Sequence, residues 1–307
     1  MADASAIQVR AARASGRVPR RAGGSARAGA GLLTAPTILS IVVLGAYPLL
    51  FILAAAFTDS TLGRPFQEWV GTANLETILA DADVVASFGR TVAYAVAVAV
   101  VSVVLGVVIA VALERATRAG AVLRTLLLLP LITPPVVVGT LWKLVFNPGG
   151  GLLATLLPGV SLTPLSTTAW ALPAIGLADV WQWTPLIVIL VYAALLTQDP
   201  SVREAASLDG AHGAGLFRHI TWPAIAGTVI AALFIRLVIA LKVFDLVFVM
   251  TSGGPGQAST VTTYLIQQVA LKEFDIGRAS AITLVFAVIV TVVTLVVAVF
   301  ARKARHD

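Results

Sequence analysis

The sequence predicts an all-α integral membrane protein with six transmembrane helices and one ordered helical loop. Of its 307 residues, 58% are hydrophobic and only 12% are charged, whereas soluble domains carry about 25% charged residues. The mean hydropathy is +0.95, and a soluble chain of this length could not bury so much apolar surface in one core. The absence of cysteine excludes disulfides and thiolate metal sites.

Six apolar segments are long enough to cross a hydrocarbon layer of about 30 Å, which takes about 20 helical residues. We expect the transmembrane helices at Leu32–Phe57, Val92–Leu113, Leu126–Phe146, Ala171–Leu196, Ala224–Val249 and Ala281–Phe300. In the third of these, Pro130, Pro134 and Pro135 are expected to kink or break the helix. Residues 32–307 therefore form one membrane domain, preceded by a basic tail, residues 1–31, that is expected to be disordered.

The distribution of Lys and Arg predicts the orientation in the membrane. Fourteen of these residues fall in the N-terminal tail, the loops after the second and fourth spans, and the C-terminus. Four fall in the loops on the other side, namely Arg64, Arg90, Lys272 and Arg278. The positive-inside rule then places both termini and the loop after the fourth span in the cytoplasm. The first segment is not expected to be a cleaved signal peptide, because its 31-residue leader and 26-residue apolar run are too long for one.

The net charge of +6 would also suit a nucleic-acid-binding protein. The basic residues stand beside apolar spans, however, where they set orientation, so we expect no nucleic-acid partner. The N-terminal tail is expected to contact anionic membrane lipid at most. On the opposite side, the long loop Thr58–Arg90 is expected to contain a short interfacial helix within Ala73–Phe88.

A polar segment between the fourth and fifth spans predicts a short, ordered helix. Asp199 can cap a helix N-terminus, and Pro200 loses no hydrogen bond at the first helical position. Gly210 suits the left-handed residue that ends such a helix. A second short helix is expected over Ala211–His219, stopped by Pro223.

This segment resembles the cytoplasmic signature loop of ABC importer permeases. Glu204-Ala205-Ala206, Gly210, Ile220 and Pro223 stand at the spacing of that signature over 20 residues, although Trp222 replaces the usual leucine. Further motifs resemble the carbohydrate branch of the family, namely Leu129–Pro135, Leu141–Lys143, Phe146–Pro148, Phe244-Asp245 and Thr251–Pro255. Within that branch, residues 32–307 are closest to the subunit type of the larger maltose-transporter permease.

The resemblance implies a type I ABC importer transmembrane domain in a bacterial or archaeal cell (inner) membrane. The implied partners are a second permease subunit in a heterodimer, two cytoplasmic ATPase subunits and an extracytoplasmic solute-binding protein. The implied cargo is a sugar, preferably a disaccharide or oligosaccharide, with glycerol phosphate or another polar solute as the alternative. The chain itself has no Gly-rich phosphate loop ending in Lys-Ser/Thr. We therefore expect a non-catalytic subunit without a cofactor, and expect ATP and Mg²⁺ in the partner ATPase.

By the same resemblance, the loop from Glu204 to Pro223 would couple this subunit to the ATPase. The residues expected to make this contact are Glu204, Ala205, Ala206, Leu208, Asp209 and Gly210. The two acids would make polar contacts, the two alanines would allow close packing, and the glycine would permit the turn. The competing interpretation is an ordinary amphipathic loop.

Ionisable groups within membrane spans are costly and are therefore candidates for function. Asp179, Gln182 and Trp183 stand at i, i+3 and i+4, so they share one helical face. A carboxylate, an amide and an aromatic ring suit a sugar, which has both hydroxyls and an apolar face. The competing interpretation is an interfacial aromatic belt containing Trp181 and Trp183, with Asp179 bonding a neighbouring helix.

Motif matching to the maltose permease extends this substrate site to other helices. The residues expected to contact substrate are Asp179, Gln182, Trp183, Leu131, Pro135, Val243 and Asp245. Lys242 and Asp245 could instead pair with each other, or with Asp179 across the bundle. Arg236 is expected to bond backbone or a partner helix rather than substrate.

Two other function classes compete with an importer subunit. An ion-driven secondary transporter could use Asp179, Lys242 and Asp245, but it predicts repeated halves with broken helices, and no such repeat is visible. A membrane-embedded enzyme would need a nucleophile or metal cluster, yet the three histidines are scattered through segments expected in the cytoplasm.

Overall fold

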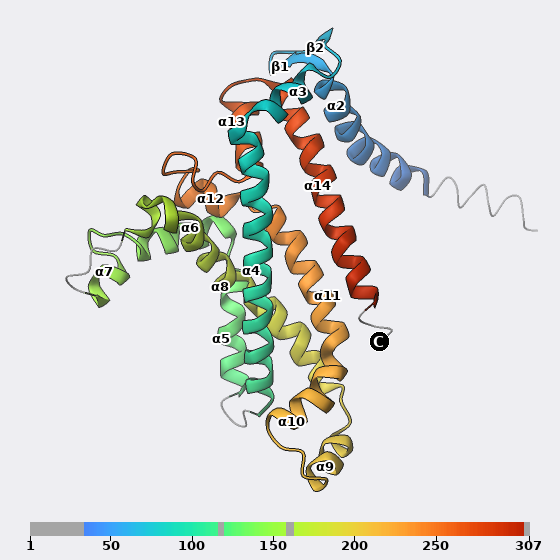
Figure 1. The fold of residues 1–307 in the computed structure, drawn as a ribbon, viewed down its shortest axis with the longest axis vertical. Helices are drawn as coiled ribbons and strands as arrows, with labels where there is room; N and C mark the ends of the chain where they lie inside the picture. Colours follow the sequence, from blue (N-terminus) through green and yellow to red (C-terminus); the bar gives the residue numbers. More distant parts are fainter. Residues whose placement is uncertain (1–33, 116–119, 158–162, 304–307) are drawn as a thin grey trace, which may run out of the picture. The chain divides into compact units, whose positions relative to one another are not determined.

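The computed structural model describes residues 34–115, 120–157 and 163–303, and their regular secondary structure is helical apart from one short hairpin (Figure 1). The chain divides into two units, residues 1–51 and 52–307. The first unit holds most of an apolar helix, Thr34–Ala56, which includes a π turn, η1 (Val42–Ala46), and leads into α2 (Tyr47–Ala56). The predicted first span is therefore confirmed, whereas the tail 1–31 lies outside the described residues.

The second unit contains the remaining elements. In chain order they are β1 (Thr58–Thr61), β2 (Arg64–Trp69), α3 (Ala73–Ala80), α4 (Ala82–Arg115), α5 (Gly120–Ile132), α6 (Pro135–Val145), α7 (Leu152–Leu156), η2 (Pro164–Ser166), α8 (Thr168–Leu196), α9 (Pro200–Leu208), α10 (Ala214–Leu216), η3 (Phe217–Thr221), α11 (Trp222–Leu241), α12 (Asp245–Met250), α13 (Thr262–Leu271) and α14 (Ile276–Lys303). Among the described residues, five helices are long and apolar enough to cross a membrane, or six if the bent pair α5–α6 counts as one span.

The centre of the second unit is formed by α4, α8 and α11, which pack along one another (Figure 1). Small residues let these helices approach closely, as is typical of helix packing in membranes. Ala95 and Ala99 of α4 and Ala174 of α8 are buried in this core. The backbone of Gly106 lies so near α8 that an added Cβ would stand 2.6 Å from the Cβ of Ile187.

The third predicted span, Leu126–Phe146, is broken at its prolines, as predicted. α5 ends at Ile132, α6 begins at Pro135, and the two helices meet at a bend of 104°. The cause is the expected one, because Pro134 has extended torsion angles (φ −57°, ψ 140°) and caps α6, with Pro135 in its first turn. Pro130 stays inside α5.

The fifth predicted span, Ala224–Val249, is wrong at its C-terminal end. α11 stops at Leu241, and α12 begins only at Asp245. Within this break, the backbone carbonyl of Val243 accepts a hydrogen bond from the hydroxyl of Thr263. The side-chain hydroxyl thus replaces a helical partner, so the break in the apolar run leaves this carbonyl satisfied.

The second short helix predicted after Gly210 is wrong as an isolated element. The helix that begins at Ala214 continues through η3 directly into α11, as one run from Ala214 to Leu241. Pro223 therefore lies in the first turn of α11, where a proline is tolerated, and does not end a helix.

The other predictions for the helices are confirmed with small shifts. α8 and α14 cover the fourth and sixth spans, and α4 covers the second but begins at Ala82, ten residues before Val92. α3 is the short helix expected in the long loop. The β1–β2 hairpin before it was not predicted. It is held to α3 by Asn74, whose amide donates to the carbonyls of Ala56 (3.1 Å) and Thr58 (3.0 Å).

Candidate functional site

A cavity of about 270 Å³ opens where α8 faces the start of α6 and the break between α11 and α12. Its lining residues are Pro135, Asp179, Gln182, Trp183, Ile239, Lys242, Val243, Phe244, Asp245 and Leu246. Six of the seven residues predicted to contact substrate are in this set. The seventh, Leu131, lies half-buried in α5 and is not among the lining residues.

Two larger hollows lie elsewhere on the helices, but their chemistry is different. One of about 460 Å³ lies between α4 and α8, and one of about 490 Å³ lies between α4, α5, α6 and α8. Neither lining contains a charged side chain. Because recognition of a polar solute needs placed hydrogen-bonding groups, the smaller cavity is the better candidate.

The geometry of the cavity follows from its proline and glycine positions. The bend before Pro135 turns α6 away from α5, and α6 then packs against α12. Gly139 permits this contact, since a Cβ there would stand 3.1 Å from the Cβ of Val249. The α5–α6 bend and the α11–α12 break thus meet the polar face of α8.

Asp179 belongs to a buried ion pair with Arg236 of α11. The Nη2 of Arg236 lies 2.8 Å from Oδ2 of Asp179, and the Tyr94 hydroxyl of α4 donates to the same oxygen at 3.0 Å. The Nε of Arg236 donates to the hydroxyl of Ser102 at 3.2 Å. Asp179 is 3% exposed and Arg236 is 0% exposed, so the charges compensate each other, as burial requires.

This network settles one of the sequence alternatives. The expectation that Arg236 bonds a partner helix is confirmed, and Asp179 does bond a neighbouring helix. Pairing of Asp179 with Lys242 or Asp245 is wrong, because its partner among the described residues is Arg236. A substrate contact by Asp179 stays a prediction, since the residue also lines the cavity.

Gln182 connects α8 to the α5–α6 bend. Its Nε2 donates to the backbone carbonyl of Thr133 at 3.0 Å, which holds the side chain beside the cavity. Its Oε1 is buried and has no hydrogen-bond partner in the described part of the chain. The amide therefore offers one acceptor that a hydroxyl in the cavity could satisfy.

Lys242 and Asp245 border the cavity at the break between α11 and α12. Lys242 is exposed and Asp245 is half-buried. Within the ranges that the structure describes, neither side chain takes part in an ion pair, so the predicted pairing of these two residues is wrong. The cavity thus has one unpaired cation and one unpaired carboxylate.

A second candidate region is the helix α9, which has the caps that the sequence predicted. The Asp199 carboxylate accepts a hydrogen bond from the backbone N–H of Ser201 at 2.9 Å, and this bond lowers the pKa of Asp199 from its ordinary value of 3.8. Pro200 occupies the first turn. Gly210 has φ +83°, the left-handed conformation expected after the helix.

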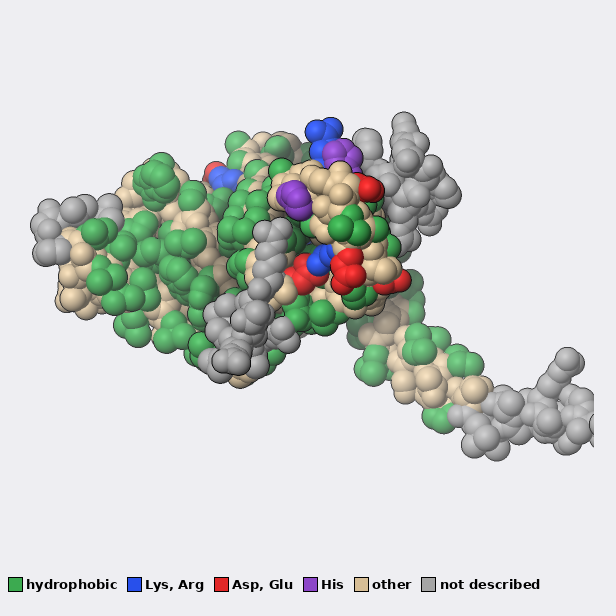
Figure 2. All heavy atoms as spheres, turned by 90° about the horizontal axis from the view of Figure 1, so that it is seen from below, with side chains coloured by type: hydrophobic (Ala, Val, Ile, Leu, Met, Phe, Trp, Pro, Cys, Tyr) green, Lys and Arg blue, Asp and Glu red, His purple; other side chains and the backbone are tan. Residues whose placement is uncertain are grey.

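One side of α9 is open. Leu208 is 88% exposed, and Glu204, Ala205, Asp209 and Gly210 are exposed as well, whereas Ala206 is half-buried. Figure 2 looks at this end of the protein and shows acidic side chains gathered there with hydrophobic side chains between them. Val202 is 50% exposed as well, so this short, capped helix presents two large apolar side chains to solvent.

Arg203 faces the opposite way and was not singled out from the sequence. Its Nη1 forms an ion pair with the Glu114 carboxylate near the end of α4, and its Nη2 donates to Oε1 of Gln198 at 3.2 Å. Arg203 and Glu114 are 89 residues apart in the chain, so no local motif could have paired them.

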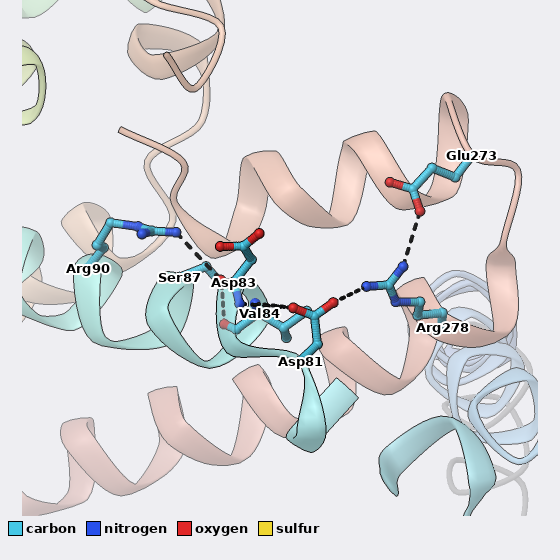
Figure 3. Close-up of polar contacts among 7 residues, drawn as sticks. All are labelled: Asp81, Asp83, Val84, Ser87, Arg90, Glu273 and Arg278. Atoms are coloured by element: carbon cyan, nitrogen blue, oxygen red, sulfur yellow. Dashed lines mark hydrogen bonds and ion pairs between the residues drawn. The ribbon is translucent and has the colours of Figure 1, made fainter. Parts of the chain in front are cut away.

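A polar cluster occupies the other end of α4 (Figure 3). Arg278 of α14 binds Asp81 at 2.5 Å and Glu273 at 3.3 Å. Asp81 also accepts from the N–H of Asp83 at 2.9 Å and so caps α4. Arg90 donates from Nε to the carbonyl of Thr260 at 2.9 Å. This cluster fixes the start of α4 against the α13–α14 region.

Among the described residues, no group of three or more His, Asp or Glu side chains could hold a metal ion. Two of the three histidines, His212 and His219, lie in the segment after α9, and His306 lies outside the described ranges. The cavity and α9 are therefore the two regions that suggest function.

Comparison with known proteins agrees with this arrangement. Residues 102–306 match the family described as binding-protein-dependent transport system inner membrane component. The chain is 31% identical to the probable ABC transporter permease protein y4oQ of Sinorhizobium fredii, over 83% of this chain and 84% of that protein. It is 32% identical to the trehalose/maltose transport system permease protein MalF of Thermococcus litoralis, over 78% and 82% of the two chains.

A third relative is the sn-glycerol-3-phosphate transport system permease protein UgpA of Agrobacterium fabrum, 29% identical over 90% of this chain and 95% of that protein. In fold, the chain is similar to a subunit of a bacterial ABC transporter that imports the acidic polysaccharide alginate. The TM-score is 0.80 at 20% identity, over 91% of this chain and 96% of that chain. The chain therefore belongs to the family of binding-protein-dependent transport system inner membrane components and is a multi-pass ABC transporter permease.

Proposed function

We propose that this chain is one of two different permease subunits in an ATP-driven importer of a neutral disaccharide or oligosaccharide. The observation that carries the proposal is the cavity, where Gln182, Trp183 and the α11–α12 break converge. The ring of Trp183 supplies an apolar face, and the free Oε1 of Gln182 supplies an acceptor for a hydroxyl. The relative named for trehalose and maltose supports the same class of cargo.

The charges at the cavity favour a neutral solute. Asp179 is compensated by Arg236, and the unpaired Lys242 is matched by the unpaired Asp245. A phosphate or polyanionic sugar needs an excess of cationic donors around it. The alternative cargo is glycerol phosphate, which one of the relatives is named for. Among the described residues that line the cavity, Lys242 is the one unpaired cation that could bind its phosphate.

We propose further that α9 docks on a cytoplasmic ATPase, through the loop from Glu204 to Pro223. Its capped N-terminus, left-handed Gly210 and exposed Leu208 support a rigid element made for contact with another protein. The distribution of Lys and Arg places both termini and α9 in the cytoplasm. ATP and Mg²⁺ then bind to the two ATPase subunits, and closure of these subunits moves α9 as a rigid body.

The remaining parts of the transporter follow from this orientation. The β1–β2 hairpin end faces the extracytoplasmic side, where a solute-binding protein delivers cargo. Residues 32–307 form the proposed permease domain, and the proposed role of the basic tail 1–31 is contact with anionic membrane lipid. The residues that line the cavity form one side of the translocation pathway, and a second permease subunit forms the other side.

The test of the proposed cargo uses the complete transporter in proteoliposomes. This chain, its partner permease, the ATPase and the solute-binding protein are combined, and ATP hydrolysis is measured with a panel of solutes. We expect stimulation by neutral disaccharides or oligosaccharides. Stimulation by glycerol 3-phosphate alone would replace the sugar by the alternative cargo, and stimulation by amino acids or peptides alone would refute both.

The test of docking uses the same preparation with substitutions in α9. Glu204→Ala and Gly210→Pro should each abolish stimulation of ATP hydrolysis by loaded binding protein, while the affinity of that protein for sugar stays unchanged. Stimulated hydrolysis that survives both changes would show that α9 is not the coupling element.

A further inference from the structure

The helix α4 carries polar side chains that contact four other parts of the structure. It is 34 residues long, or about 51 Å at 1.5 Å per residue. In chain order, Arg90 binds the carbonyl of Thr260 before α13, and Tyr94 binds Asp179 of α8. Nearer the α9 end, Ser102 of α4 binds Arg236 of α11, and Glu114 binds Arg203 of α9.

The last of these contacts joins α9 to a helix that is not its neighbour in sequence. Arg203 is the residue of α9 that turns from the open side towards the helix bundle. Its side chain is 27% exposed and that of Glu114 is 16% exposed, so the ion pair is largely shielded from water. α9 has no buried residue of its own, and this ion pair attaches it directly to α4.

We propose that Arg203 and Glu114 are positioning residues that transmit the movement of α9 to α4. The inference rests on the proposed docking of α9 on the ATPase, and it adds the contact through which movement of α9 is transmitted to α4. Movement of α9 reaches α8 and α11 through the chain itself. The same movement reaches α4 only through non-covalent contacts, and the Arg203–Glu114 ion pair is a direct contact between α9 and α4.

The far end of this route is the wall of the cavity. Tyr94 and Ser102 of α4 hold the Asp179–Arg236 pair, and Asp179 lines the cavity. At Gly106, the backbone of α4 packs directly against Ile187 of α8. A shift of α4 therefore has to move α8 or break bonds to a buried ion pair, which is costly. The pair Arg203–Glu114 thus connects the docking surface to the cavity.

The experiment is a double-mutant cycle in the complete transporter in proteoliposomes, with loaded solute-binding protein as the stimulus. The variants are Arg203→Gln, Glu114→Gln, the double variant and Arg203→Lys. The measured quantity is the ratio of stimulated to basal ATP hydrolysis. We expect each single neutral variant to lower the ratio about three- to tenfold, and the double variant to lower it no further. Arg203→Lys should retain most of the ratio, because it keeps the ion pair.

Thermal stability separates transmission from a general loss of folding. Arg278→Gln is the control, because Arg278 is about as exposed as Arg203 (25% against 27%) and its loss breaks the ion pairs with Asp81 and Glu273 at the other end of the protein. We expect Arg203→Gln to lower the melting temperature by no more than this control. A larger drop that Arg203→Lys does not correct would overturn the proposal, as would additive effects in the cycle or an unchanged ratio in the single variants.

Failure of this inference is distinguishable from failure of docking itself. If Gly210→Pro abolishes stimulation and Arg203→Gln does not, α9 docks but the ion pair does not transmit its movement. If Gly210→Pro leaves stimulation intact, the proposed docking of α9 is wrong, and the transmission through Arg203 falls with it.

Discussion

Asp179 of α8 and Arg236 of α11 form an ion pair of 2.8 Å inside the helix bundle, and α4 closes the pair from a third side with Tyr94 and Ser102. The pair links the three central helices at the edge of the cavity. Such a link ties the movement of each of these helices to that of the other two. Because Arg236 compensates the charge of Asp179, the burial of this carboxylate is explained without any contact with substrate.

The first prediction concerns the stability of this pair. Asp179→Ala leaves the Arg236 cation buried without its partner, and we expect a loss of about 3–5 kcal/mol. The double variant Asp179→Leu with Arg236→Met removes both charges and should recover most of that loss. The measurement is thermal unfolding in detergent. Equal damage by the single and double variants would contradict the view that the two charges mainly compensate each other.

The second prediction separates the two tryptophans of α8. Trp183 lines the cavity, whereas Trp181 is 41% exposed on another face and contacts Trp142 with ring centroids 6.1 Å apart. Trp183→Leu should raise the KM for sugar uptake about tenfold, equivalent to about 1.4 kcal/mol of lost binding.

Trp181→Leu is the control for this experiment, because it removes an equally large ring from the same helix. Its KM should stay within about twofold of the parent value, which is below 0.5 kcal/mol. If the two variants have the same KM, the tryptophans form an aromatic belt and the cavity does not bind the cargo.

The sequence predicted most helices and one face of the cavity, because both follow from short-range patterns. Long apolar runs define α8 and α14, and the spacing of Asp179, Gln182 and Trp183 places them on one side of α8 whatever its partners are. The bend before Pro135 was likewise predictable, since a proline removes a backbone donor.

The features that escaped prediction depend on contacts between distant segments. The apolar run from Ala224 to Val249 gives no sign of the break at Val243, whose carbonyl is satisfied by Thr263, 20 residues away. The partner of Asp179, Arg236, is 57 residues away, and the sequence also offered Lys242 as a cation that could pair with it across the bundle. The sequence shows which charged residues could pair, but the packing of α4, α8 and α11 determines that Asp179 pairs with Arg236.

The third prediction tests the cap of the docking helix. The hydrogen bond from Ser201 lowers the pKa of Asp199, so the carboxylate form stabilises α9. That contribution is fully present above the ordinary pKa of 3.8 and is lost as the pH falls through the lowered pKa in the folded protein. The protection factor of the Ser201 amide, which is its intrinsic exchange rate divided by the measured rate, should therefore fall only below about pH 3.8, and should already be low at pH 7 in Asp199→Ala.

Asp199→Asn is the matched variant for the cap, because asparagine caps a helix without titrating in this range. It should protect the Ser201 amide at pH 7 and lose no protection through that carboxylate as the pH falls. Equal exchange rates in Asp199→Asn and Asp199→Ala at pH 7 would mean that the side-chain cap does not hold α9.

The fourth prediction uses the two unpaired charges of the cavity to identify the cargo. For a neutral sugar, Lys242→Gln removes at most one of several hydrogen bonds, so the KM should rise less than about tenfold, or 1.4 kcal/mol. For glycerol phosphate, the same change removes the unpaired cation that borders the cavity, and uptake should be lost.

Asp245→Asn is the opposite control, because it removes a negative charge and should improve uptake of an anion. Uptake of labelled disaccharide and of glycerol 3-phosphate by proteoliposomes measures both effects. Loss of disaccharide uptake in Lys242→Gln, with normal assembly of the transporter, would contradict the neutral-sugar proposal, because a neutral solute has no charge for Lys242 to compensate.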